Sequence, residues 1–156
     1  MSRVLISFAT MSGNTEKVAQ YFVEQLPLII PETEVSLVNM MELQEEQFTE
    51  YDLIILGSST WTDGELNPIA EEFFDNIKNS VMEYTTFKFG LFGLGESYYP
   101  EFCTSVDKMA EIIKQKKGNV IGELLRLDGY VDDDKLNNSL EWLRGVVNKM
   151  ESANQN

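Results

Sequence analysis

The six residues Thr10–Thr15, TMSGNT, concentrate hydrogen-bond donors at the point where an apolar run gives way to an amphipathic segment. They hold three hydroxyls, one amide and a glycine, and neither lysine nor arginine. The unpaired amides at a helix N-terminus together carry roughly half a positive charge, so they can bind a phosphate without any cation. Gly13 allows close approach of the backbone, and Asn14 tolerates unusual backbone angles. We therefore predict a phosphate-binding turn, with ordinary helix capping by Ser12 or Asn14 as the alternative.

The motifs that are missing from this turn limit the class of phosphate ligand that it could bind. It has neither the GxxxxGK[ST] pattern of nucleoside triphosphate hydrolysis nor the GxGxxG pattern of dinucleotide binding. A phosphorylated receiver domain would have acidic residues where the preceding strand ends, whereas this chain has Ala9 and Thr10 there. A neutral turn of this kind suits a terminal phosphate monoester.

Two later polar segments carry aromatic residues. Trp61 stands in SSTWTDGE, where the nearest apolar neighbour is Leu66, and Tyr98 and Tyr99 stand in ESYYPEF. A tryptophan in such a loop either folds back onto the core or covers a flat ligand. Two aromatic loops that flank one crevice could hold a planar ring between them, while Phe102 is expected to pack inward.

Composition excludes several classes of function. The chain has no histidine, which removes the commonest general acid or base near neutral pH and the commonest metal ligand. Its one cysteine, Cys103, cannot form an internal disulfide. The net charge of −14, from 26 acids and 12 bases, would repel nucleic acid and anionic membranes and attract basic partners. Solubility alone is the other interpretation of this charge.

With no signal peptide and no apolar stretch near the ~20 residues of a membrane span, we expect a cytoplasmic protein.

The elements that must position these loops alternate between strands and helices. Strands are predicted over 3–9, 33–40, 51–59, 87–95 and 119–127. Helices are predicted over 13–26, 66–79 and 135–150 and in a segment that ends at Gly118, with a short helical turn within 40–48. Five strands alternating with helices imply an α/β, doubly wound parallel sheet with helices on both faces. We expect one domain over 1–150 and a polar tail over 151–156.

The three loops resemble those of the flavodoxins in sequence and in order. TMSGNT is similar to their phosphate loop, SSTWTDG to the loop on the inner flavin face, and GESYYPEFC to the loop with the outer aromatic residue. The similarity runs over nearly the whole chain, and the absence of a long insertion in the fifth strand matches the short-chain, bacterial group. The resemblance implies a three-layer fold with a five-stranded sheet of order 2-1-3-4-5.

The resemblance also implies a function. It implies one non-covalently bound FMN and a low-potential one-electron carrier, not an enzyme. The partners implied are flavin-containing reductases of the ferredoxin/flavodoxin-NADP reductase type and acceptor redox enzymes with basic docking surfaces. The high like charge favours a monomer. A flavodoxin-fold NAD(P)H-dependent quinone or flavin reductase is the alternative, and a non-redox module that binds a phosphate monoester is a third possibility.

The cofactor-binding residues that the resemblance implies come from all three loops. Trp61 would stack on the inner ring face and Tyr99 on the outer face, with Tyr98 the weaker candidate, and Ser59 would also reach the phosphate. Thr60, Asp63 and Gly95 would contact the ribityl chain and the ring edge. The full set is Thr10, Met11, Ser12, Gly13, Asn14 and Thr15; Ser58, Ser59, Thr60, Trp61, Thr62, Asp63 and Gly64; and Gly93, Leu94, Gly95, Tyr98, Tyr99, Phe102 and Cys103.

Charge and backbone stiffness in these loops bear on the redox behaviour that the resemblance implies. A unit negative charge ~10 Å from the ring opposes reduction by about 0.4 to 1.7 kcal/mol, and Asp63, Glu65, Glu96 and Glu101 lie in the loops. Thr62 stands where the family often has a glycine whose following peptide flips on one-electron reduction. A β-branched residue is stiffer than glycine, so we expect this flip to cost more here.

Two further features have plain structural interpretations. Cys103 is interpreted as a small, half-buried residue at a helix start and not as a nucleophile, because no histidine is present to activate it. The acidic run Asp132–Asp134 is interpreted as charge at a helix start, because it lacks the ligand spacing of a calcium site. No metal site is predicted.

Overall fold

The computed structural model describes residues 2–10, 13–60, 65–95 and 103–154, including the side chains of all these residues except 153 and 154. Its strands form one parallel sheet in the order β2-β1-β3-β4-β5, and β6 also pairs with β4. The elements are β1 (Arg3–Ala9), α1 (Asn14–Ile29), β2 (Glu34–Asn39), η1 (Met40–Glu42), η2 (Glu45–Glu50), β3 (Leu53–Ser59), α2 (Pro68–Lys78), β4 (Lys88–Gly95), α3 (Thr104–Gln115), β5 (Asn119–Val120), β6 (Leu125–Asp128) and α4 (Asp133–Asn154).

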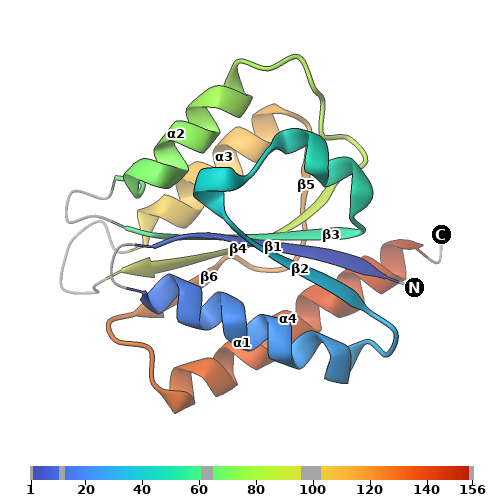
Figure 1. Cartoon of the computed structure of the whole chain (residues 1–156), viewed down its shortest axis with the longest axis vertical. Coiled ribbons are helices and arrows are strands. Elements are labelled where there is room, and N and C mark those ends of the chain that lie inside the picture. Colours follow the sequence, from blue (N-terminus) through green and yellow to red (C-terminus); the bar gives the residue numbers. More distant parts are fainter. Residues whose placement is uncertain (1, 11–12, 61–64, 96–102, 155–156) are drawn as a thin grey trace.

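Three layers make up the fold. Helices α1 and α4 cover one face of the sheet, and α2, α3 and the short helices η1 and η2 cover the other (Figure 1). Strands β1 and β3 are buried along nearly their whole length, which agrees with their continuous apolar sequences. Alternate residues of β1 face opposite layers, so Leu5 and Ala9 join the core under α2 while Val4, Ile6 and Phe8 join the core under α1. The doubly wound parallel sheet predicted from the sequence is confirmed.

The prediction of one unbroken fifth strand over 119–127 is wrong. Val120 pairs with Phe89 and Leu125 pairs with Phe92, so the chain takes five residue steps where β4 takes three. The two extra residues leave the sheet at Gly122, whose φ of 76° lies in the left-handed region. A Cβ atom there would lie 2.9 Å from a methyl group of Val146, so glycine also permits the close approach to α4.

Several helix ends differ from the sequence prediction by a few residues. Helix α1 continues to Ile29, past Pro27, and α4 continues to Asn154. Helix α2 begins at Pro68, because Asn67 caps it by accepting a hydrogen bond from the amide of Ile69 at 2.9 Å. The amphipathic stripes predict these helices correctly, whereas their ends depend on the capping contacts.

Strands β3 and β4 pack through a glycine and an aromatic ring. Gly57 pairs with Phe92 in the sheet, and a Cβ atom on Gly57 would lie 2.0 Å from the Phe92 ring. That ring meets Phe22 of α1 edge to face, with the ring centroids 5.5 Å apart. The space above Gly57 is therefore filled by the neighbouring strand's side chain.

Within the described ranges, no helix combines the length and the apolar character needed to cross a bilayer. The same ranges contain no group of three or more His, Cys, Asp or Glu side chains placed to hold a metal ion.

Candidate functional site

The carboxyl ends of the central strands lie at one edge of the sheet (Figure 1). Ala9 at the end of β1 pairs with Ser58, and Ser59 at the end of β3 pairs with Leu94. The three polar segments singled out in the sequence follow β1, β3 and β4, so all of them start from this edge. In open α/β sheets, ligands bind beyond the carboxyl ends of the strands where the strand order reverses, which here is between β1 and β3.

The turn between β1 and α1 places a glycine at the N-cap position of the helix. Gly13 occupies the N-cap position with φ 92°, and its carbonyl accepts the first helical hydrogen bond from Lys17 at 3.0 Å. Since the capping residue is a glycine, no side chain at that position satisfies the first-turn amides, and Asn14 is already inside the helix. Thr10 Oγ1 accepts from the Gly13 amide at 2.9 Å, which fixes the turn. A Cβ atom on Gly13 would meet nothing within 4 Å, so open space lies beside this backbone.

Thr15 provides a buried polar atom without a partner at this same helix terminus. Its side chain is 0% exposed, and Oγ1 has no hydrogen-bond partner among the described residues. An unpaired buried hydroxyl costs about 1–3 kcal/mol, so it marks a place where an acceptor is missing. Among the described residues, the other such hydroxyl belongs to Ser7, which shares its sheet face with Leu5 and Ala9, across the sheet from α1. A bound anion at the α1 terminus would accept from Thr15.

The base of the second loop is closed by backbone and hydroxyl contacts. The Thr60 amide donates to the Leu94 carbonyl at 2.8 Å, and Thr60 and Leu66 form an antiparallel bridge. The Thr60 and Ser105 hydroxyl oxygens lie 2.6 Å apart. Ser58 is buried, and its hydroxyl donates to the Ser59 carbonyl at 2.9 Å. These contacts join the loop base to β4 and to the start of α3.

Asn67 orients Ser59, and the sequence analysis did not assign this role. The Asn67 side chain is buried and donates from Nδ2 to Ser59 Oγ at 2.9 Å while its oxygen caps α2. A serine hydroxyl that accepts in this way keeps its proton for another acceptor. Asn67 shows only a capping signal in the sequence, because its second partner lies eight residues away.

The base of the third loop is closed between Gly95 and Cys103. A Cβ atom on Gly95 would lie 3.1 Å from the Cys103 amide nitrogen, so Gly95 and Cys103 are close together. The Gly95 carbonyl accepts from the Gly129 amide at 2.8 Å. Gly93 lies against Val106 of α3, where a Cβ atom would approach the Val106 Cβ to 3.0 Å. Glycines at these positions allow the β4 end to pack directly against the α3 start.

Cys103 is fully buried and not half-buried as predicted. It adopts a left-handed backbone conformation with φ 55°, and its thiol lies 3.5 Å from the Gly93 carbonyl oxygen and 3.6 Å from that of Leu127. Burial raises the pKa of the thiol to about 12. A thiol in this state is inert, which agrees with a structural interpretation.

An ion pair between β6 and α3 fixes the carbonyl of Cys103. Arg126 forms a two-pronged contact with Asp107, at 2.7 and 2.8 Å, and one of its nitrogens also donates to the Cys103 carbonyl at 3.3 Å. The hydrogen bonds from Arg126 hold the pKa of Asp107 below its usual value. Sequence reasoning missed this pair, because nothing in a local pattern links residues 19 positions apart on different elements.

Lys17 connects α1 to the segment after β6. Its ammonium donates to the Val131 carbonyl at 2.9 Å and lies 5.0 Å from the centre of the Tyr130 ring. The cation nearest in sequence to the β1–α1 turn is therefore already engaged. Further along, Asp132 accepts from the Lys135 amide at 2.9 Å, which confirms the helix-start interpretation of the acidic run.

The structure places the described members of the predicted site at one edge of the sheet: Thr10, Gly13, Asn14 and Thr15 at the first turn, Ser58, Ser59 and Thr60 at the second loop, and Gly93, Gly95 and Cys103 at the third. Leu94 contributes its backbone carbonyl, while its side chain lies in the core under α1 and α4. The predictions for Met11, Ser12, Trp61, Thr62, Asp63, Gly64, Tyr98, Tyr99 and Phe102 lie outside the described residues, as do those for Glu96 and Glu101.

The sequence and the fold are similar to those of known flavodoxins. Residues 6–142 match the profile of the flavodoxin family. A probable flavodoxin 1 of Bacillus subtilis is 32% identical over 135 residues, which cover 86% of this chain and 83% of that protein. The crystal structure of oxidised flavodoxin 2 from Bacillus cereus has a TM-score of 0.86 to this structure. Its chain is 32% identical, and the match covers 95% of this chain and 99% of that one. A mutant flavodoxin of Fusobacterium nucleatum bound to flavin mononucleotide shares the fold, with a TM-score of 0.74, 16% identity and coverage of 96% and 97%.

Proposed function

The chain belongs to the flavodoxin family, and on this premise we propose that it carries single electrons by means of one non-covalently bound FMN. Flavodoxins are electron-transfer proteins and not enzymes, so the chain is expected to have no substrate of its own. The observation that carries the proposal is the buried Thr15 hydroxyl at the N-terminus of α1, which has no hydrogen-bond partner among the described residues. When bound, FMN supplies a flavin ring that can take up and release electrons one at a time.

The described residues fit the phosphate of such a cofactor. The first-turn amides of α1 and the Thr15 hydroxyl would donate to the phosphate oxygens, and Thr10 fixes the turn by accepting from the Gly13 amide. Ser59 would add a donor, because Asn67 already occupies its acceptor side. No cation is needed, since amide and hydroxyl donors to an anion form strong, charge-assisted hydrogen bonds.

The loop bases would place the remaining groups around the flavin. Thr60 is tied to Leu94 and Ser105, and Gly95 lies against Cys103, so the second and third loops start from fixed points. We propose that Trp61 and Tyr99 cover the inner and outer ring faces, with Tyr98 as the weaker candidate for the outer one. Asp63 and the backbones of Thr60 and Gly95 would contact the ribityl chain and the ring edge.

Partners and setting belong to the same proposal. Transient docking to flavin-containing reductases and to basic acceptor enzymes is supported by the net charge of −14. We also propose that the chain acts in the cytoplasm as a monomer, with a single FMN-binding domain over 1–150. The competing function is a quinone or flavin reductase of the same fold, which would oxidise NAD(P)H directly.

Stepwise reduction of the FMN-loaded protein tests the proposal. The visible spectrum should not change when NADPH is added alone and should bleach once a catalytic amount of a ferredoxin–NADP reductase is present. Bleaching by NADPH alone would favour the reductase alternative. Colourless protein that takes up no added FMN would favour a module without redox chemistry.

A further inference from the structure

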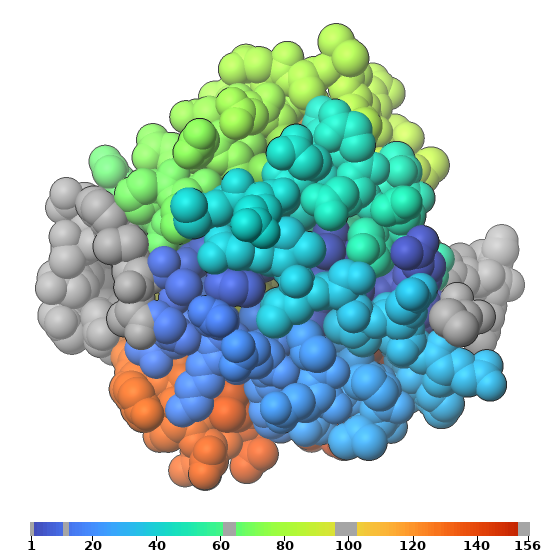
Figure 2. Space-filling model, viewed as in Figure 1, coloured from blue at the N-terminus to red at the C-terminus, as the bar shows by residue number. Residues whose placement is uncertain are grey.

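A groove of about 310 Å³ lies between α2 and the short helices η1 and η2. Its floor is formed by the buried apolar side chains of Met40, Leu43, Phe73 and Ile77. Figure 2 shows η1 and η2, in cyan and turquoise, beside the green α2 on the face turned to the viewer. The groove is therefore an indentation with an apolar base on the α2 side of the sheet.

The rim of this groove carries only negative charge. Glu45, Glu46 and Glu72 supply three carboxylates, and none of the described residues that line the groove is a lysine or arginine. Glu45 already accepts from the Tyr84 hydroxyl at 2.7 Å and from the Ser80 hydroxyl at 3.0 Å. Glu46 and Glu72 are exposed, so their charges are available to a partner.

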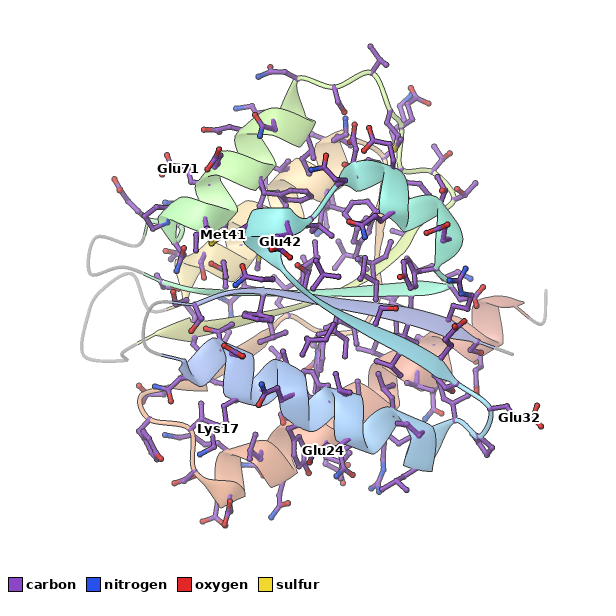
Figure 3. All side chains as sticks on the ribbon, viewed as in Figure 1. Lys17, Glu24, Glu32, Met41, Glu42 and Glu71 are labelled. Carbon is purple, nitrogen blue, oxygen red and sulfur yellow. The ribbon has the colours of Figure 1, made fainter. Side chains whose placement is uncertain are left out.

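An exposed methionine borders the acidic rim. Met41 lines the groove and yet is 70% exposed, which is unusual for so apolar a side chain. Figure 3 shows Met41 and Glu42 on η1, with Glu71 on the neighbouring α2. Methionine is flexible and adapts to irregular partners. An apolar floor with a methionine beside it and carboxylates around it matches a long cationic side chain, whose methylenes pack on apolar surface while its charged end reaches an acid.

We propose that this groove receives a lysine or arginine side chain from the docking face of a redox partner protein. The methylene groups lie against Met41 and the partly buried Ile69, and the cation lies between Glu46 and Glu72. The inference rests on the proposed function, because it supposes that the chain meets such partners.

The position of the groove suits docking near the candidate flavin site. Helix η1 begins directly after β2, whose last residue, Asn39, pairs with Phe8 near the end of β1. The groove therefore starts at the same carboxyl edge of the sheet as the phosphate turn, beside β2, which is the strand next to β1. A partner anchored there would cover this edge of the sheet, and its complementary charge would guide association.

Three variants test the proposal. Glu46→Gln combined with Glu72→Gln removes the two free carboxylates of the rim. Asn76→Trp adds an aromatic ring to the groove lining without changing the charge. The matched control combines Glu24→Gln with Glu32→Gln, which removes the same charge from exposed positions on the other side of the sheet (Figure 3).

The measurement is an amide chemical-shift titration of isotope-labelled, FMN-loaded protein with reduced cytochrome c, a basic haem protein, at low salt where charges act over about 20 Å. Shift changes should concentrate at 40–46 and 69–77. The Kd should rise about three- to tenfold for the rim variant and at least about threefold for Asn76→Trp, against less than about twofold for the control.

These outcomes test docking at the groove independently of FMN binding. Equal weakening by the control and the rim variant, or wild-type binding by Asn76→Trp, would show that docking does not use the groove. Oxidised flavin and reduced cytochrome c exchange no electrons in this mixture, so the titration reports docking alone. Failure to load FMN would contradict the proposed function, and the same titration on the apoprotein would still test the groove.

Discussion

Replacing Thr15 by valine should affect the apoprotein and the FMN complex in opposite directions. The Thr15 hydroxyl is buried and has no partner among the described residues, and valine keeps the shape of the side chain while removing the hydroxyl. An unpaired buried hydroxyl costs about 1–3 kcal/mol, so the apoprotein of Thr15→Val should be as stable as the wild type or more stable by about 1–2 kcal/mol.

The same substitution should weaken FMN binding. A hydrogen bond to a charged phosphate contributes about 1.5–3 kcal/mol, so its loss corresponds to a Kd higher by about 10- to 150-fold. Ser7→Ala is the matched control, because the Ser7 hydroxyl is also buried without a partner among the described residues but faces the layer of α2 and not that of α1. The control should stabilise the apoprotein or leave it unchanged, without changing the Kd for FMN.

Urea unfolding of the two apoproteins and titration of FMN fluorescence measure these two effects. A Thr15→Val apoprotein that is clearly less stable than the wild type would show that the hydroxyl is already satisfied without cofactor. An unchanged Kd would show that it does not reach the phosphate. Either result would refute the assignment of Thr15.

Three further outcomes follow from other parts of the structure. The Cys103 thiol, with its pKa raised to about 12, should resist iodoacetamide at pH 8 in native protein and react rapidly in urea, and fast native labelling would contradict its burial. Gly57→Ala should lower the free energy of unfolding in urea by about 3 kcal/mol or more, since its Cβ would lie 2.0 Å from the Phe92 ring. Gly145→Ala in α4, whose Cβ would meet nothing within 4 Å, should raise it by about 0.5–1 kcal/mol. Equal effects of the two substitutions would refute the packing argument. Arg126→Gln should cost about 0.2–1 kcal/mol near neutral pH, because the pair with Asp107 is partly exposed. Since the folded pKa of Asp107 is lowered, this difference should be present above the ordinary aspartate pKa near 4 and shrink as the pH falls through the lowered value; a difference independent of pH would contradict the pairing.

The sheet and its helices could be predicted because their signals are local. Continuous apolar runs such as Leu53–Ser59 belong to strands buried on both faces, and the amphipathic stripe of α2 gives its inner side directly. The break between β5 and β6 gives no such signal, because Gly122 stands within an otherwise strand-like apolar run. It depends on α4, where the Trp142 indole donates to the Glu123 carbonyl at 2.6 Å. Contacts of this kind require the packed helix.

The candidate site divides in the same way. The density of hydroxyls in TMSGNT favours a phosphate turn, because helix-terminus chemistry follows from a few adjacent residues, and this turn stays a prediction. Asn67 and Arg126 were not found, since each acts on a partner in another element: Asn67 on Ser59, and Arg126 on the Cys103 carbonyl. The sequence thus suggests candidate ligand-binding groups, whereas the residues that orient them become visible only in the folded contacts.

Comparing the affinities of the apoprotein for FMN and for riboflavin tests the central claim most directly. The two ligands share the ring and the ribityl chain and differ in the phosphate, which is the group that the α1 terminus and Thr15 are expected to hold. Isothermal titration should give a Kd for FMN at least about 100-fold lower than that for riboflavin, the equivalent of two or more charge-assisted hydrogen bonds. Affinities within about threefold of each other would contradict the account.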